Sequence, residues 1–117
     1  MEVQVFGTKK DSETRKALRF FSERRVKVHF VDLMERAASL GELKRFAQKF
    51  GVTSLIDRNA KSFVDPGLQY ARLSDERWLE KLADEPSLLR QPLTRYQHRL
   101  TIGAAEPEWK RWIDESK

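Results

Sequence analysis

The chain has 117 residues, enough for a single hydrophobic core, and combines 39% apolar residues with 35% charged residues. It contains no cysteine, which excludes disulfides, thiol catalysis and cysteine-ligated zinc. The formal charge of +5 favours acidic partners. No apolar stretch approaches the about 18 residues of a membrane span, and no apolar signal segment opens the sequence, so we expect a cytoplasmic protein.

The first third of the chain predicts a strand, a helix and a second strand. A short apolar strand over residues 3–6 ends at Gly7. Apolar residues at helical spacing follow over about 12–23, with Asp11 or Ser12 in the N-cap position. The stretch VKVHFVDLM then alternates as a half-buried strand would, with Val26, Val28 and Phe30 set against Lys27, His29 and Val31. These elements form a βαβ unit with parallel strands.

The middle of the chain predicts mainly helices. A helix over about 39–50 carries an apolar stripe of Leu40, Leu43, Phe46 and Phe50, and Gly51 ends it. Residues 51–72 are expected to be irregular, with short helical turns. Ser74 then caps a helix that includes Trp78, Leu79 and Leu82 and ends before Pro86.

The end of the chain predicts two strands and a helix. The stretch PLTRYQHRLTIG indicates two short strands around a turn near Gln97–His98. The stretch AEPEWKRWIDE indicates a final helix with Pro107 in its first turn, and Trp109, Trp112 and Ile113 facing inward. The whole order is β-α-β, helices, β-β-α. This is the order of the α/β thioredoxin-like fold, with a central mixed four-stranded sheet. We therefore expect one domain over 1–117 with a helical insertion at about 37–88.

Sequence motifs extend this interpretation over about residues 3–114. The motifs are FGTKKDSETRKAL, SLIDRNAKSF followed by GL, DEPSLLRQPL and RLTIGAAEPEWKRW. Together they resemble the arsenate reductase–like family, which also contains the Spx-type transcription regulators. The first motif is similar to the family's strand-loop-helix, which normally carries a cysteine, often followed three residues later by Cys, Ser or Thr.

The resemblance assigns the family's functional positions to residues that have changed. The nucleophilic cysteine maps to Asp11, and the resolving position maps to Thr14. The arginine that precedes the family's proline maps to Gln91, whereas Pro92 is retained and is implied to follow a cis peptide facing the Asp11 loop. The insertion-loop arginine falls near Asp57, Arg58 or Asn59, and an arginine of the last strand maps to Ile102.

These changes argue against the family's redox chemistry. Arsenate reduction of this type needs a thiolate at the helix N-terminus and arginines that hold the oxyanion. A carboxylate at Asp11 repels an anion at about 4 Å by about 4 kcal/mol at a surface-like dielectric. We therefore expect a pseudoenzyme without thiol-based arsenate reductase activity, cofactor or metal.

Asp11 itself has two interpretations. The favoured one is a helix cap worth about 1 kcal/mol, which also interacts well with the helix dipole. The other is a phosphoryl acceptor or metal ligand, which needs companion carboxylates such as Asp57 and Asp65. We favour the cap.

Cations supply the remaining candidates. The first helix and its end carry Arg15, Lys16, Arg19, Arg24 and Arg25, which form either a solvated face or a contact for phosphates or an acidic protein. Aromatic residues do not interleave with them, so sequence-specific nucleic-acid binding is not expected. Arg58 and Arg90 are expected near the former active site, where they hold an anion weakly or, as we favour, pair with Asp11. His29 and His98 are expected at the surface.

Two classes of function remain. The first is a monomeric, non-enzymatic interaction or regulatory protein of the Spx type. The resemblance then implies docking on the C-terminal domain of the RNA polymerase α subunit, with Gly51 in the docking surface. The second is a residual glutathione- or oxyanion-dependent enzyme of the same family. A paralogue that folds but does little is also left open. We favour the first class.

Overall fold

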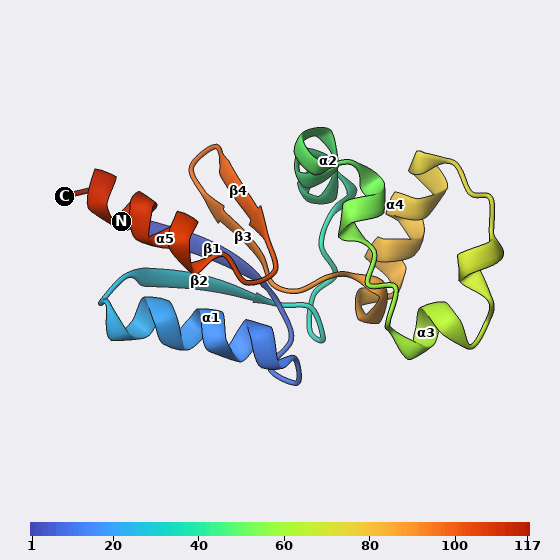
Figure 1. The fold of residues 1–117 in the computed structure, drawn as a ribbon, viewed down its shortest axis with the longest axis horizontal. Helices are drawn as coiled ribbons and strands as arrows, with labels where there is room; N and C mark the ends of the chain where they lie inside the picture. The colour runs from blue at the N-terminus through green and yellow to red at the C-terminus, as the bar shows by residue number, and fades with distance from the viewer. The chain divides into compact units, whose positions relative to one another are not determined.

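The computed structural model describes residues 1–117, and the chain divides into two compact units (Figure 1). Met1–Arg36 and Gln91–Lys117 form the first, which we call the sheet unit. Ala37–Arg90 form the second, which we call the helical unit and which contains the segment expected as an insertion. That the chain behaves as one domain stays a prediction.

The sheet unit is built on four strands, as the sequence predicted. They are β1 (Glu2–Gly7), β2 (Lys27–Asp32), β3 (Leu93–Tyr96) and β4 (Arg99–Ile102), in the spatial order β2-β1-β3-β4. The β1 and β2 strands run parallel, whereas β3 pairs antiparallel with both β1 and β4. The sheet is therefore mixed, and the thioredoxin-like α/β class is confirmed.

Two helices of the sheet unit, α1 (Ser12–Glu23) and α5 (Glu106–Glu115), pack on one face of the sheet. Their buried residues form one cluster with the β1 valines: Val3, Val5, Ala17, Phe20, Phe21, Trp109 and Trp112. The Trp109 ring lies 5.1 Å from the Phe21 ring and 5.4 Å from the Phe20 ring, and its indole N–H donates to the Thr101 hydroxyl at 2.9 Å. Burial of these large aromatic rings, together with the hydrogen bond of the Trp109 indole, holds the two helices to the sheet.

One detail of β2 differs from the predicted alternation. Val31 was set on the polar side, but it is only 4% exposed. Val31 pairs with Phe6, which pairs in turn with Leu93, and both of these side chains are also buried. Because cross-strand partners share a face, this end of the sheet has an apolar row on the face opposite α1 and α5. The simple half-buried pattern therefore fails at this end of the strand.

The helical unit contains two longer helices and several single turns. The longer ones are α2 (Leu40–Phe50) and α4 (Asp75–Asp84), and the short ones are α3 (Lys61–Val64), η1 (Val52–Leu55), η2 (Leu68–Tyr70) and η3 (Pro86–Leu88). Ser39 and Glu42 form a capping box at the start of α2, and the Ser74 hydroxyl accepts from the Arg77 N–H at the start of α4. The predicted Ser74 cap and the predicted short turns over 51–72 are confirmed, whereas the capping box at Ser39 was not predicted.

The apolar stripe of α2 is shorter than predicted. Leu43 and Phe46 are buried, but Leu40 is 41% exposed and Phe50 is 36% exposed. The stripe positions at the two ends of the helix thus reach solvent, while the central turn carries the packing. No helix in either unit is both long enough and apolar enough to cross a bilayer.

Candidate functional site

The loop between β1 and α1 carries Asp11 as a helix cap. Its backbone is extended (φ −80°, ψ 126°), and its Oδ2 accepts the Thr14 N–H at 2.8 Å and the Thr14 hydroxyl at 2.9 Å. The Asp11 N–H donates to the Thr8 carbonyl at 3.1 Å, which closes the loop. One carboxylate oxygen therefore satisfies two donors at the start of α1, as predicted for a cap.

Gln91 reaches the same helix start from the other end of the sheet unit's sequence. Its Oε1 accepts the Thr8 N–H at 2.8 Å and the Thr8 hydroxyl at 3.1 Å, and lies 3.5 Å from the Thr14 hydroxyl. The Gln91–Pro92 peptide is cis, as the resemblance implied, and the Pro92 carbonyl accepts the Gly103 N–H at 2.8 Å. The structure thus brings Asp11, Thr14, Gln91 and Pro92 together.

Two members of this cluster were not singled out from the sequence. Thr8 supplies both donors to Gln91, and Gly7 gives Thr14 its room. A Cβ on Gly7 would lie 2.5 Å from the Thr14 Oγ1, which is closer than real contacts allow, and Thr14 is fully buried. The sequence feature that could have indicated both residues is the Gly-Thr pair at the end of the first strand. Glycine is favoured there because strand and helix approach each other closely. We call these residues the helix-start cluster: Gly7, Thr8, Asp11, Thr14, Gln91 and Pro92.

The helix-start cluster offers little to an incoming anion. The groups that face the helix start are the Asp11 carboxylate and the Gln91 amide oxygen, both acceptors. The Thr8 N–H donates to the Gln91 amide oxygen, and the Thr14 N–H donates to the Asp11 carboxylate. The Asp11 carboxylate takes part in none of the ion pairs of the structure. The polar groups of the cluster thus bond to one another and hold the start of α1 to the end of β1.

Arg15, a predicted anion- or partner-binding candidate, binds the loop that precedes α1. Its Nη1 donates to the carbonyls of Lys9 and Lys10 at 2.7 and 2.9 Å, and its side chain is exposed. Arg15 therefore fixes the loop before α1 and keeps its charge at the surface.

Arg58, Arg90 and Gly51, the other candidates, belong to the helical unit. The Arg58 guanidinium lies 5.7 Å from the centre of the Phe63 ring, and the Arg90 Nη1 donates to the Ser54 carbonyl at 3.4 Å. Asp11 belongs to the sheet unit, so the pairing of either arginine with it stays a prediction. Gly51 ends α2 with φ +85°, and a Cβ placed there would meet no atom within 4 Å. Gly51 is thus an exposed and uncrowded position.

The proposed companion carboxylates also lie in the helical unit. Asp57 and Asp65 line an open hollow of about 530 Å³ with Ser62 and Ser87, and the Asp57 Oδ1 accepts the Asn59 N–H at 3.0 Å. No group of His, Cys, Asp or Glu side chains in the structure gathers in the number that a metal ion needs. Because Asp11 belongs to the sheet unit, its phosphoryl-acceptor or metal-ligand interpretation stays the less favoured prediction.

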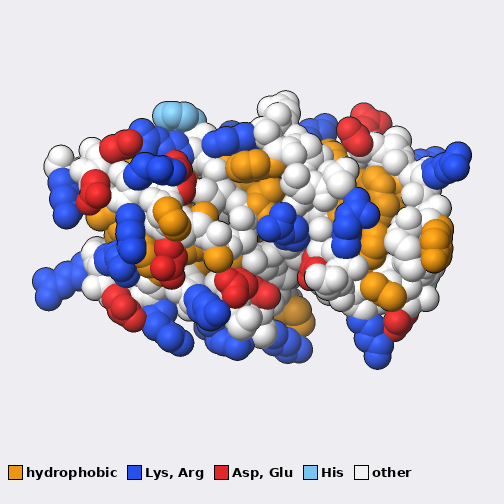
Figure 2. Space-filling model, viewed as in Figure 1, with side chains coloured by type: hydrophobic (Ala, Val, Ile, Leu, Met, Phe, Trp, Pro, Cys, Tyr) orange, Lys and Arg blue, Asp and Glu red, His pale blue; other side chains and the backbone are white.

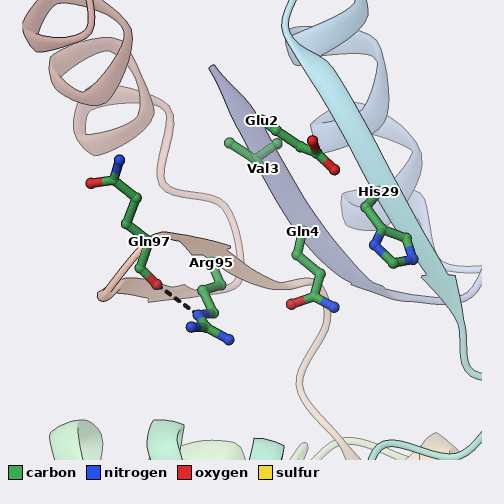
Figure 3. Close-up of a pocket in the computed structure, with 6 residues that line it drawn as sticks. All are labelled: Glu2, Val3, Gln4, His29, Arg95 and Gln97. Atoms are coloured by element: carbon green, nitrogen blue, oxygen red, sulfur yellow. Dashed lines mark hydrogen bonds between the residues drawn. The ribbon is translucent and has the colours of Figure 1, made fainter.

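A second hollow, of about 270 Å³, lies on the face of the sheet opposite α1 and α5 (Figure 3). Gln4 pairs with His29 on one side and Arg95 on the other, so the three form a row across neighbouring strands. The Arg95 Nε donates to the Gln97 carbonyl at 2.6 Å. His29 and His98 are exposed, as predicted. The hollow is open and mixed in charge, and none of the predicted site residues lines it.

Comparisons with known proteins agree on one family. The sequence model described as the ArsC family matches residues 6–112, nearly the whole chain. An arsenate reductase of Neisseria meningitidis serogroup A is 26% identical over 105 residues, which cover 87% of this chain and 90% of that protein. The global transcriptional regulator Spx 2 of Bacillus anthracis is 23% identical over 116 residues, which cover 97% of this chain and 88% of that protein.

A solved structure shows the same fold. The arsenate reductase from Vibrio cholerae superposes with a TM-score of 0.77 over 87% of this chain and 89% of that chain, at 22% identity. At this identity the likeness concerns the fold alone. In sequence, the Neisseria arsenate reductase and the Bacillus regulator Spx 2 resemble this chain at nearly equal identity.

Proposed function

The chain belongs to the ArsC family, and on that premise we propose that it is a non-enzymatic interaction protein of the Spx type. It works by docking on a protein partner, with the C-terminal domain of the RNA polymerase α subunit as the partner that the resemblance points to. Such a role places it in the cytoplasm, and it needs no cofactor.

One observation carries the proposal. The two positions at which the family's chemistry needs a thiol and an arginine hold Asp11 and Gln91, and both side chains are engaged in hydrogen bonds that hold the fold together. The chain has no cysteine elsewhere that replaces the lost nucleophile. The family's fold is retained without its catalytic groups, so we infer that the protein acts through its surface.

The match to Spx 2 supports the docking role. It extends over 97% of this chain and therefore includes the helical unit, where Gly51 lies. Gly51 is exposed, a Cβ built on it would meet no atom within 4 Å, and Phe50 beside it exposes 36% of its surface. An exposed aromatic next to an open backbone is a suitable anchor for a partner.

The test is a pull-down of the purified RNA polymerase α subunit by the tagged chain, washed at low and at moderate salt. The variants are Phe50→Ala and Gly51→Arg. Since Gly51 has a positive φ, a side chain there is also strained, and Gly67→Arg is the control because Gly67 has φ +72°. Retention by the wild type and by Gly67→Arg, with loss in the two variants near Gly51, supports the proposal. If the wild type does not retain the subunit, or if every variant retains it equally, this docking surface is wrong.

A further inference from the structure

The exposed side of α1 and the loops at its two ends carry a concentration of positive charge. We call it the α1 basic surface, and its residues are Lys9, Lys10, Arg15, Lys16, Arg19, Arg24 and Arg25. All of these side chains are exposed. Figure 2 shows Lys and Arg side chains along the lower edge of the sheet unit, where Figure 1 places α1. Glu13 and Glu23 are the acidic residues of the helix itself.

Most of this charge is not neutralised within the molecule. Lys16 pairs with Glu13 at 3.4 Å, and this is the one ion pair on the surface. Elsewhere in the sheet unit, cations do have carboxylate partners, as in the pairs Arg99–Glu115 and Arg111–Glu108. The unpaired charge of the α1 basic surface is therefore available to an external polyanion.

Several of these cations are held in place by contacts that leave their charge intact. Arg15 binds the carbonyls of Lys9 and Lys10 and so orders the loop that presents both lysines. The Arg24 guanidinium lies 3.8 Å from the centre of the Phe20 ring and donates to the Phe20 carbonyl at 3.1 Å. Groups that are ordered before binding lose less conformational entropy when a partner arrives.

The chemistry of the surface favours a nucleic acid over a protein. Protein interfaces have a desolvated centre with aromatic or aliphatic anchors and few charges. The apolar residues of α1 do not supply one, because Ala17, Phe20 and Phe21 are buried and Leu18 is half-buried. Interfaces with nucleic acids are instead polar and strongly positive, and serine hydroxyls such as those of Ser12 and Ser22 also contact phosphates.

From these observations we propose that the α1 basic surface binds the phosphate backbone of double-stranded DNA without sequence preference. Exposed aromatic rings, on which unpaired bases would stack, are absent from this surface, so a duplex fits better than a single strand. The proposal goes beyond docking on a protein partner and does not depend on it. The DNA-binding reaction needs only the purified chain and a duplex.

The experiment measures the fluorescence anisotropy of a labelled DNA duplex of mixed sequence as the protein is added, at several salt concentrations. We expect the logarithm of the binding constant to fall linearly with the logarithm of salt, with a slope of about −3 to −5, because each phosphate contact contributes about −0.9. A duplex of unrelated sequence should bind equally well.

The variant combines Lys10→Gln, Lys16→Gln and Arg19→Gln, which leaves the cations that order the loop and the helix end unchanged. Its affinity should fall at least about tenfold, and its salt slope should become shallower by about 2 to 3. The matched control combines Lys44→Gln, Arg45→Gln and Arg77→Gln, which removes the same charge from exposed positions in the helical unit. The control should keep the wild-type slope.

Each remaining outcome overturns the proposal. Equal loss in the variant and the control would mean that net charge alone drives binding. Preference for a single-stranded competitor would contradict the duplex. Absence of binding at low salt would leave an acidic protein as the occupant of the surface. Since no polymerase is present, none of these outcomes depends on the docking test.

Discussion

The start of α1 and the exposed side of α1 are built in opposite ways. At the start, the Asp11 carboxylate accepts the Thr14 N–H. The Gln91 amide oxygen accepts the Thr8 N–H. Along the side, cations from Lys9 to Arg25 stay exposed, and one of them has a carboxylate partner. The same helix thus carries bonded acceptors at its N-terminal end and exposed cations along its flank.

The two regions therefore differ in how much their polar groups contribute to the free energy of folding. The polar groups of the helix-start cluster bond to one another, so they contribute to folding and leave little for a ligand. The exposed cations form few internal bonds, so they contribute little to folding and keep their charge for a partner. Stability measurements should separate the two regions sharply, because substitutions in the cluster are costly and those on the flank are not.

The largest effect is expected at Gly7. The Gly7→Ala variant should lose about 3 kcal/mol of the free energy of unfolding, because the added methyl group overlaps Thr14 in a buried site. Urea denaturation measures this loss. Gly41→Ala in α2 is the control, since its Cβ would meet nothing closer than 3.9 Å and alanine favours a helix. Equal stability of the Gly7→Ala variant and the wild type would show that strand and helix do not need this close approach.

A smaller loss is expected at Asp11. The Asp11→Ala variant removes the acceptor of both Thr14 donors, so the free energy of unfolding should fall by about 1 to 2 kcal/mol. Asp11→Asn keeps an acceptor and should lose less. Denaturation of the two variants side by side gives the answer. If Asp11→Ala were more stable than the wild type, the carboxylate would be strained by the site rather than capping it.

Much of the fold followed from the sequence because its signals are local. Asp11, Ser39 and Ser74 mark the starts of three helices that the sequence predicted. The order of the elements and the four motifs predicted the mixed four-stranded sheet. Val31 and the ends of the α2 stripe were misjudged because burial there depends on packing beyond the element itself. Gln91 was found only through the family's pattern, since an isolated Gln-Pro pair does not indicate that the side chain bonds to Thr8.

The helix start should still be able to stabilise a thiolate. In an Asp11→Cys variant, the Thr14 N–H and the helix dipole should lower the pKa of the new thiol below that of an ordinary cysteine. The chain has no other cysteine, so the rate of alkylation against pH reports this thiol alone. Arsenate reduction should remain absent because Gln91 supplies no guanidinium. A thiol of ordinary or raised pKa would show that the cluster has lost more than the nucleophile.

The smallest effect is expected on the flank of α1. Arg19 has no ion-pair or hydrogen-bond partner, so Arg19→Gln should change the free energy of unfolding by less than about 0.5 kcal/mol. The same denaturation series measures it. A loss as large as that of Asp11→Ala would mean that the flank also holds the fold, and the contrast between the two regions would disappear.

The most direct test of the closed helix start is whether small ligands stabilise the protein. Thermal and urea unfolding are followed with arsenate, phosphate or glutathione at increasing concentrations, at constant ionic strength. A ligand that binds the native state adds about 2.7 kcal/mol at a hundred times its dissociation constant. We predict no stabilisation by any of the three. Stabilisation that disappears when Thr8 or Gln91 is changed would mean that the helix start is not closed and that it holds a working ligand site.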